Sequence, residues 1–177
     1  MFLKEVTDPA EKSALCDKTL RALPQWFGVE KSIVDYVSQV RSLPFFAACE
    51  DGAVIGFAAL KIHSAYAAEI AVMGVLPEYH RRRTGAKLLH SCEQYCLAHS
   101  IEFLTVKTLD ASCEYEPYER TRRFYLKAGF RPLEVFPLLW DAENPCLLLA
   151  KYIVNPDWRY PCSSRSSTNT ATCCGKS

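Results

Sequence analysis

The amino-acid sequence predicts an α/β fold, in which helices flank a sheet, and three observations support this class. Asp51-Gly52 stands between two apolar runs and is a strong signal for a β-hairpin. Residues 70–76 form a nearly unbroken apolar run, which is typical of a strand buried on both faces. Apolar residues then recur at helical spacing over 88–99, and a short apolar run follows at 103–106. Strand, helix and strand in this order predict a βαβ unit.

Turn and cap residues place the remaining elements. A polar residue before Pro9 can cap a helix that has this proline at its first position. Gly129 is the expected C-cap of a helix over 120–128. Four apolar residues of a helix over 30–40, Val34 among them, are spaced to share one buried face. The expected strands are 2–6, 45–49, 54–62, 70–76, 103–106, 130–136 and 146–154.

Length and composition limit the classes of protein. The chain has 177 residues, and we expect one domain over 1–160 followed by a disordered, Ser/Thr/Cys-rich tail over 161–177. The 21 Lys and Arg balance 20 Asp and Glu, so no overall basic field favours a nucleic acid or a membrane as partner. No signal peptide or long apolar span is present, and nine cysteines, an odd number, fit free thiols in a reducing compartment. We therefore expect a cytoplasmic location.

Two other ligand sites can be set aside. Cys92 and Cys96 lie one helical turn apart with His99 near the same face, but small thiols that face a core have the same spacing. We therefore expect no metal. The last three residues are similar to the end of a P-loop, but Thr170 stands where that motif requires glycine. We reject a P-loop there.

A basic loop links the strand over 70–76 to the helix that follows it. A loop that enters a helix offers unpaired backbone N–H groups and the positive end of the helix dipole, which suit phosphate oxygens. We expect Gly85 to allow the positive φ that turns these groups toward one anion. The alternative is a solvated charge run before a helix. The loop consists of Arg81, Arg82, Arg83, Thr84, Gly85 and Ala86.

This loop resembles the acyl-CoA signature Q/R-x-x-G-x-G/A of the Gcn5-related N-acetyltransferase (GNAT) superfamily. His80, Arg83 and Gly85 stand at its three fixed positions. Residues 124–130, Phe-Tyr-Leu-Lys-Ala-Gly-Phe, are similar to the family's (F/L)-Y-x-x-x-G-F junction. The resemblance implies a GNAT fold: a central mixed, mostly antiparallel twisted sheet of six to seven strands, with a parallel βαβ pair splayed around acyl-CoA and about four flanking helices.

The resemblance also implies an activity, which is transfer of the acetyl group of acetyl-CoA to a primary amine by direct attack in a ternary complex. Met73, Gly74 and Val75 would hold the pantetheine arm of this co-substrate, and the loop over 81–86 its pyrophosphate. Tyr125 would protonate the departing thiolate. An N–H of the strand, such as that of Met73 or Val75, would stabilise the oxyanion.

A base must also remove a proton from the amine, and Glu69 resembles the base of part of the superfamily. Both catalytic roles have structural alternatives: Tyr125 as a core aromatic and Glu69 as a strand-end carboxylate that faces solvent. Cys113 lies in the acceptor-side loop, but no histidine is near it in sequence, so covalent catalysis is a weak alternative. The rival bases are Glu114, Glu116 and Glu119.

The acceptor is not identified by the sequence. Loops 63–68 and 109–120 shape the acceptor pocket in this superfamily, and three glutamates in them could suit a cationic small-molecule or peptide amine. A homodimer stays open as an assembly. A different class of function is a degenerate member that binds acyl-CoA as a sensor or assembly module, since Arg83 replaces the first Gly and Tyr118 a frequent Asn. The two acceptor-side loops, 63–68 and 109–120, also carry His63, Tyr66, Tyr115 and Tyr118.

Overall fold

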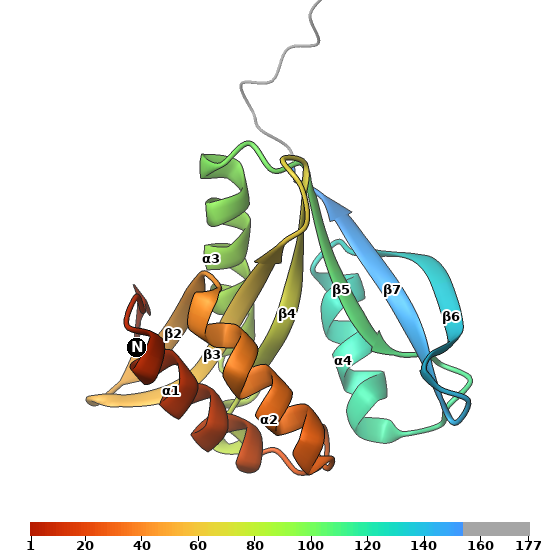
Figure 1. Ribbon diagram of the computed structural model, residues 1–177, viewed down its shortest axis with the longest axis horizontal. Coiled ribbons are helices and arrows are strands. Elements are labelled where there is room, and N and C mark those ends of the chain that lie inside the picture. The colour runs from red at the N-terminus through yellow and green to blue at the C-terminus, as the bar shows by residue number, and fades with distance from the viewer. Residues whose placement is uncertain (154–177) are drawn as a thin grey trace, which may run out of the picture.

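The computed structural model describes residues 1–153, which form a seven-stranded sheet with two helices on each face (Figure 1). Residues 154–177, including the expected tail, lie outside the described residues. The strands are β1 Phe2–Glu5, β2 Phe45–Glu50, β3 Ala53–Ile62, β4 Ala67–Val75, β5 Phe103–Leu109, β6 Arg131–Asp141 and β7 Asn144–Tyr152. The helices are α1 Pro9–Arg21, α2 Glu30–Gln39, α3 Thr84–Ala98 and α4 Glu116–Lys127, with 3-10 segments η1 Val40–Ser42 and η2 Pro77–Tyr79.

The strand order is β1-β2-β3-β4-β5-β7-β6. Strands β4 and β5, which α3 connects, run parallel, and every other neighbouring pair is antiparallel. This topology confirms the mixed, mostly antiparallel sheet with one parallel βαβ unit. Within residues 1–153, no helix is long and apolar enough to cross a membrane.

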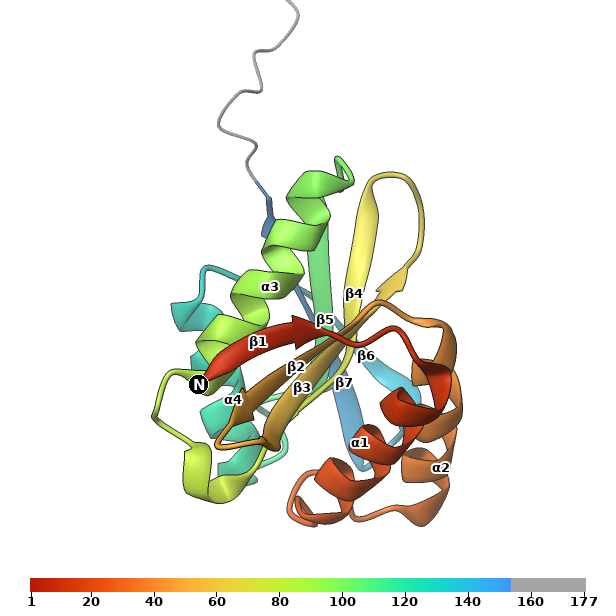
Figure 2. The ribbon, with the colours of Figure 1, turned by 90° about the vertical axis from the view of Figure 1, so that its left-hand side faces the viewer.

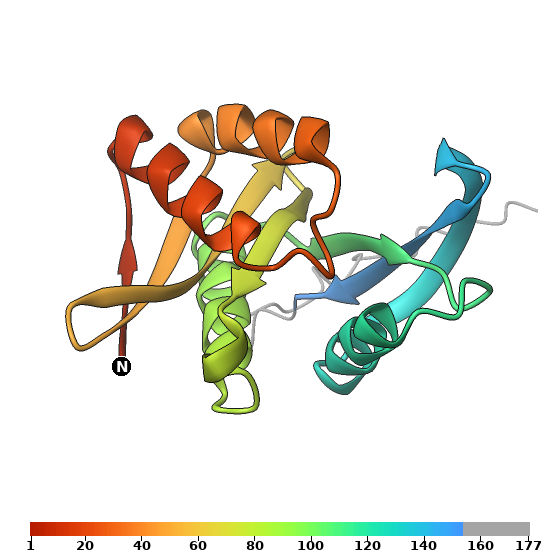
Figure 3. The same ribbon diagram turned by 90° about the horizontal axis from the view of Figure 1, so that it is seen from below.

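The sheet separates two hydrophobic cores. Helices α1 and α2 cover one face and α3 and α4 cover the other, as Figures 2 and 3 show. The core under α1 and α2 includes Phe45 and Phe57, whose rings stack 4.8 Å apart. The core under α3 and α4 includes Leu88, Leu104 and Phe130, all fully buried. Each face of the sheet therefore presents its own set of side chains to any ligand.

Local residue choices explain where several elements begin and end. The Asp8 side chain accepts a hydrogen bond of 2.9 Å from the Glu11 N–H and caps α1, as its position before Pro9 predicts. Asp51 and Gly52 both have positive φ, 51° and 79°, which suits the tight turn between β2 and β3. Gly129, with φ of 96°, follows the end of α4 as predicted.

Two details of the sequence prediction are wrong. Helix α4 begins at Glu116 rather than 120, because Pro117 occupies its first turn, where a missing N–H costs nothing. Val34 is 54% exposed and does not share the buried face of α2 with Ile33 and Val40. Because α2 packs mainly against α1 and η1, its buried stripe is narrower than its apolar pattern suggests.

Strands β4 and β5 separate halfway along their length. Their pairing runs only from Ala67 opposite Phe103 to Ile70 opposite Val106. The next residue, Ala71, is a β-bulge, since Ile70 pairs with Leu60 and Val72 with Ala59 of β3. Beyond the bulge β4 continues with β3, and β5 continues with β7 (Figure 3). We call this point the splay.

Candidate functional site

The edge of β4 beyond the splay presents free backbone groups. The Leu76 N–H donates a 2.9 Å hydrogen bond to the Ile55 carbonyl of β3. Because successive residues of a strand direct their N–H and C=O groups to opposite edges, those of Met73 and Val75 face away from β3. No β5 residue pairs with them. This half-strand can therefore accept an extended ligand that carries amide groups.

Gly74 allows α1 to lie close to this half-strand. A Cβ atom at Gly74 would be 3.0 Å from Leu23 Cδ1 and 3.1 Å from Thr19 Cγ2, which is tighter than ordinary packing. The half-buried side chains of Met73 and Val75 point to the other face and pack against the core under α3 and α4. The three residues expected to hold pantetheine thus have different roles, two as edge residues and one as a spacer.

The basic loop differs from expectation in which residues adopt positive φ. Arg81 and Arg83 have φ of 59° and 65°, whereas Gly85 has an ordinary helical φ in the first turn of α3. A Cβ at Gly85 would be 3.5 Å from the Phe124 ring of α4, an ordinary contact. The expectation that Gly85 supplies the left-handed residue is therefore wrong, because α3 begins one residue before it and Arg83 is its N-cap.

The N-terminus of α3 is open to an anion. Arg83 makes no side-chain cap, and the first turn contains no acidic residue. The Thr84 hydroxyl donates instead to the Tyr79 carbonyl, 3.3 Å away, and the side chain is 1% exposed. The N–H groups of Thr84, Gly85 and Ala86 lack intrahelical partners, as in any first helical turn. These groups and the helix dipole favour a phosphate at this point.

The three arginines of the loop are not equivalent. Arg82 pairs with Glu50 at 3.2 Å, and its guanidinium lies 5.0 Å from the centre of the Tyr79 ring. Arg81 and Arg83 are exposed and form no ion pair within residues 1–153. Two guanidinium groups are therefore available to a ligand without breaking an existing pair.

Tyr125 is buried in the core under α3 and α4. Its ring lies edge-to-face against Phe124 at 5.1 Å and Phe130 at 5.3 Å, and the residue is 4% exposed. Burial, followed by the neighbouring Cys92, raises the pKa of Tyr125 above its usual range. Its hydroxyl has no hydrogen-bond partner in the described part of the chain. Tyr125 is thus a core aromatic, which was the alternative to its catalytic role. It also keeps a protonated hydroxyl.

Glu69 is a buried carboxylate with two partners. Its Oε2 lies 2.6 Å from Lys107 Nζ and 2.7 Å from His63 Nε2, and its side chain is 12% exposed. The alternative of a strand-end carboxylate that faces solvent is therefore wrong. The reason is the parallel pairing with β5, which places Thr105 opposite Glu69 and brings Lys107 to its side.

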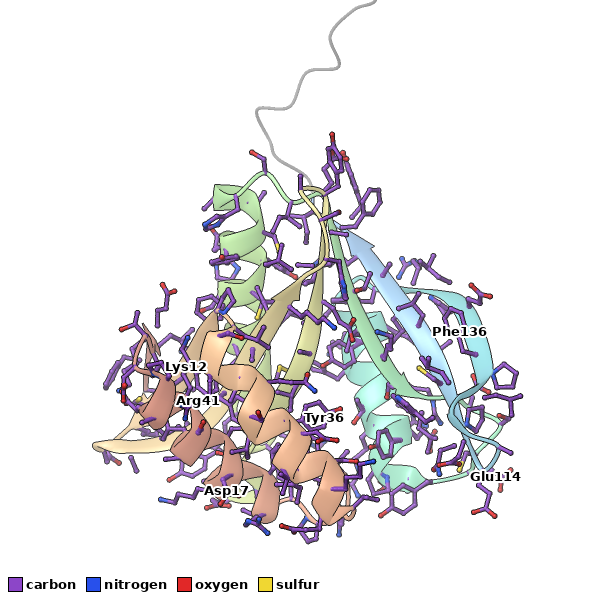
Figure 4. The ribbon with its side chains drawn as sticks, viewed as in Figure 1. Lys12, Asp17, Tyr36, Arg41, Glu114 and Phe136 are labelled. Carbon is purple, nitrogen blue, oxygen red and sulfur yellow. The ribbon has the colours of Figure 1, made fainter. Side chains whose placement is uncertain are left out.

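Glu69 and Tyr125 lie on opposite faces of the sheet at the splay. Ala68 and Ile70 belong to the same core as Tyr125, and Glu69 between them must point to the other face. Tyr36 of α2 lies on that face and packs against the core under α1 and α2. Burial, and next the Glu69 charge, raise the pKa of Tyr36. Figure 4 shows Tyr36 between α2 and the part of the molecule that carries β5 and α4. Two ligands can therefore approach the splay, one from each face of the sheet.

Two of the rival bases already have partners, and the third lies at the edge of the molecule. Glu116 and Glu119 form ion pairs with Arg120 and Arg123 along α4. Glu114 lies at the periphery in Figure 4, far from Tyr36. Cys113 is half-buried, and no histidine bonds to it among residues 1–153.

The acceptor-side loops are brought together only in part. His63 reaches Glu69, and the Tyr118 hydroxyl donates to the Trp26 carbonyl at 3.0 Å. Burial and the nearby Tyr36 raise the pKa of Tyr118 to about 12. Tyr66 is 63% exposed in the β3–β4 turn and does not take part.

Sequence reasoning missed Lys107, Tyr36 and Trp26. The one available signal was Lys107, a lone cation within an apolar strand, which requires a partner if it is buried. Tyr36 and Trp26 gave no signal, because their relevance depends on contacts between distant segments. In the part of the chain that the structure describes, no group of three or more His, Cys, Asp or Glu could hold a metal ion. Cys92 and Cys96 are fully buried.

Comparison with known proteins agrees with this geometry. The sequence profile of the Acetyltransferase (GNAT) family matches residues 11–130. The chain belongs to the GNAT acetyltransferase family. A search of curated proteins finds no match.

Solved structures share the GNAT fold with this protein. A GNAT-family protein from Desulfovibrio desulfuricans is 17% identical with a TM-score of 0.74, covering 86% of this chain and 99% of that one. An aminoglycoside 6'-N-acetyltransferase complexed with coenzyme A is 18% identical with a TM-score of 0.70, covering 88% and 98%. The ribosomal-protein-S18-alanine N-acetyltransferase of Escherichia coli is 13% identical with a TM-score of 0.66, covering 90% and 100%.

Proposed function

We propose that this GNAT protein transfers the acetyl group of acetyl-CoA to a primary amine by direct attack in a ternary complex. The observation that carries the proposal is the continuity of the splay with the open N-terminus of α3. The free edge of β4 leads through η2 into the basic loop, so an amide-containing arm and a pyrophosphate can bind along one path. Few other ligands combine these two parts.

The residues fit acetyl-CoA as follows. The pantetheine amides would bond to the N–H and C=O of Met73 and to the N–H of Val75. The Val75 carbonyl is already occupied by His80 Nε2, 2.7 Å away. The pyrophosphate would lie against the N–H groups of Thr84, Gly85 and Ala86, with the guanidinium groups of the loop around it. Arg81 and Arg83 are free for that role, and Arg82 would have to leave Glu50.

The bound acetyl-CoA supplies a thioester whose carbonyl carbon an amine can attack. Glu69 takes a proton from the amine, directly or through water, because an alkylammonium with a pKa of about 10.4 is not nucleophilic. The N–H of Met73 or Val75 stabilises the charge that develops on the carbonyl oxygen. As the C–N bond forms and the C–S bond breaks, Tyr125 gives its proton to the leaving sulfur, and the nitrogen loses its second proton, which passes through water to restore the Tyr125 hydroxyl. The products are an amide and free CoA.

The amine is proposed as a small molecule or a peptide. Two structural neighbours are an aminoglycoside 6'-N-acetyltransferase and a ribosomal-protein-S18-alanine N-acetyltransferase, so both classes belong in the first panel. Calorimetry with CoA tests the donor site, and release of free CoA from acetyl-CoA with each amine tests transfer. One-site CoA binding with amine-dependent release supports the proposal. No binding at millimolar CoA contradicts it, and binding without turnover for any amine favours the sensor or assembly module.

A further inference from the structure

Trp26, in the connection between α1 and α2, contacts the start of α4. Its indole N–H is shared between the Pro117 carbonyl at 3.2 Å and the Thr121 Oγ1 at 3.1 Å. The contact is also made in the other direction, since the Tyr118 hydroxyl donates to the Trp26 carbonyl at 3.0 Å. Three residues of α4 are thus bound to one loop residue that is distant in the sequence.

The same indole reaches the end of β4 through His80. The rings of Trp26 and His80 lie edge-to-face with centroids 5.7 Å apart. His80 Nε2 donates to the Val75 carbonyl at 2.7 Å, so this nitrogen carries the hydrogen. A continuous series of contacts therefore runs from α4 through Trp26 and His80 to Val75. We call it the Trp26 bridge.

The bridge crosses a place where the sheet provides no restraint. Strand β4 has no hydrogen bonds to β5 beyond Ile70, so the separation of the two halves of the protein is not fixed by a ladder there. Helix α4 lies along the β5 half and carries Tyr125, and its Phe124 lies next to Gly85 of the basic loop. A shift of α4 would change the positions of both groups relative to β4.

We propose that Trp26 is a positioning residue of the acyl-transfer site, which holds the start of α4 at a fixed distance from the end of β4. The inference rests on the proposed acyl-CoA site. Without the bridge, α4 and β4 must be ordered when CoA binds, and that ordering reduces affinity and misplaces Tyr125 relative to the thioester. Trp26 itself touches neither the thioester nor the amine.

The test compares Trp26→Phe with Trp140→Phe. Phenylalanine keeps an aromatic ring beside His80 but removes the N–H donor and part of the indole's bulk, and Trp140, 45% exposed on β6, receives the same change outside the bridge. We expect Trp26→Phe to weaken CoA binding about three- to tenfold in calorimetry and to lower kcat, with the KM for the amine unchanged. Trp140→Phe should match the wild type in all three.

Tyr118→Phe removes the second link, which is the hydrogen bond from the Tyr118 hydroxyl to the Trp26 carbonyl. It tests the same bridge even if Trp26→Phe does not fold. Because both variants break one bridge, the double variant should lose less CoA affinity than the two single losses combined. In a protein with Trp140 and Trp158 replaced by Phe, the fluorescence of Trp26 should change with CoA at the calorimetric Kd.

Three results separate the possibilities. If Trp26→Phe lowers only the Tm while CoA affinity and kcat stay at wild-type values, Trp26 is a packing residue and the inference is wrong. Fully additive losses in the double variant also overturn it, since they mean that no shared bridge exists. If the wild-type protein does not bind CoA, the proposed function fails first, whatever the variants do.

Discussion

Lys107 Nζ lies 2.6 Å from Glu69 Oε2, so the carboxylate proposed as base is bound to a lysine from the neighbouring strand. Both side chains are on the sheet face that α2 covers, and His63 approaches the same oxygen. The second oxygen, Oε1, is left for the amine or a water. The pair fixes the orientation of the Glu69 carboxylate beside the splay.

Glu69→Gln should lower kcat about 10²–10⁴-fold if Glu69 is the base. The deficit should shrink as the assay pH approaches the pKa of the amine, because the neutral amine then no longer needs the carboxylate. Glu93→Gln is the matched control, since Glu93 of α3 pairs with Lys151 at 2.6 Å on the other face of the sheet. Rate and pH profile are measured by CoA release. A constant deficit at every pH, or an equal loss in Glu93→Gln, argues against a base at Glu69.

Tyr125→Phe should lower kcat about 10- to 100-fold and leave CoA affinity nearly unchanged, since only the hydroxyl is removed and a thiolate leaves easily. Because burial raises the pKa of Tyr125, its hydroxyl stays protonated throughout a neutral to mildly alkaline profile. Tyr95→Phe provides the control, as Tyr95 also packs against this core and stacks on His99 at 3.9 Å. Wild-type turnover by Tyr125→Phe would show that the residue only packs.

Arg83→Gly should raise the unfolding free energy by about 1 kcal/mol, because a residue other than glycine is strained at φ of 65°. The same change removes a cation that we expect at the phosphates, so CoA affinity at low salt should change less than about tenfold and depend less on ionic strength. Arg83→Ala loses the charge and keeps the strain, so it should bind worst.

Ser100→Gly is the control for the two Arg83 variants. Ser100 also has a positive φ, 57°, but follows the far end of α3, so its change should raise the Tm without affecting the salt dependence of binding. Thermal melts and calorimetry at two salt concentrations check both variants. If Arg83→Gly abolishes binding while Arg83→Ala is tolerated, the placement of phosphate in this loop is wrong.

The buried thiols should resist alkylation at pH 8. Burial raises the pKa of Cys16 to about 12 and that of Cys96 to about 11, and that of Cys92 further. Among the cysteines of residues 1–153, half-buried Cys113 should react first with iodoacetamide, as peptide mass spectrometry can show. Because the folded-state pKa values are raised, stability is fully present below the thiols' unfolded pKa of about 8.5 and falls as the pH rises through the folded values. Equal labelling of Cys92 and Cys113 in the native protein would contradict this.

Short-range signals were enough to predict most of the fold. The Asp51-Gly52 turn, the proline at the start of α1 and Gly129 after α4 each determine a boundary through the φ that they allow. The start of α4 was missed although Pro117 marked it, because the charged stretch before 120 has no apolar period. Local backbone chemistry therefore predicted boundaries better than hydrophobic pattern did.

The candidate site was predictable only where it depends on one segment. The half-strand and the basic loop are contiguous in sequence, and a resemblance could identify them. The pairing of Glu69 with Lys107 requires the β4–β5 register, and the Trp26 bridge requires two segments that meet only in the folded protein. The positive φ of Arg83 follows from where α3 begins, which periodicity does not define to one residue.

The bulge at Ala71 has a consequence for how mutations in β4 would act. Ile70 pairs with Leu60 and Val72 with Ala59, so deleting Ala71 would join two residues whose partners in β3 are already neighbours, and Met73 and Val75 would keep their partners and their free edge. A bulge bends its strand, so the deletion would remove the bend at which β4 leaves β5. The protein could then fold with a longer, tighter sheet and still lose its opening. A single additional alanine thus separates the half of β4 that pairs with β5 from the half whose outer edge is free.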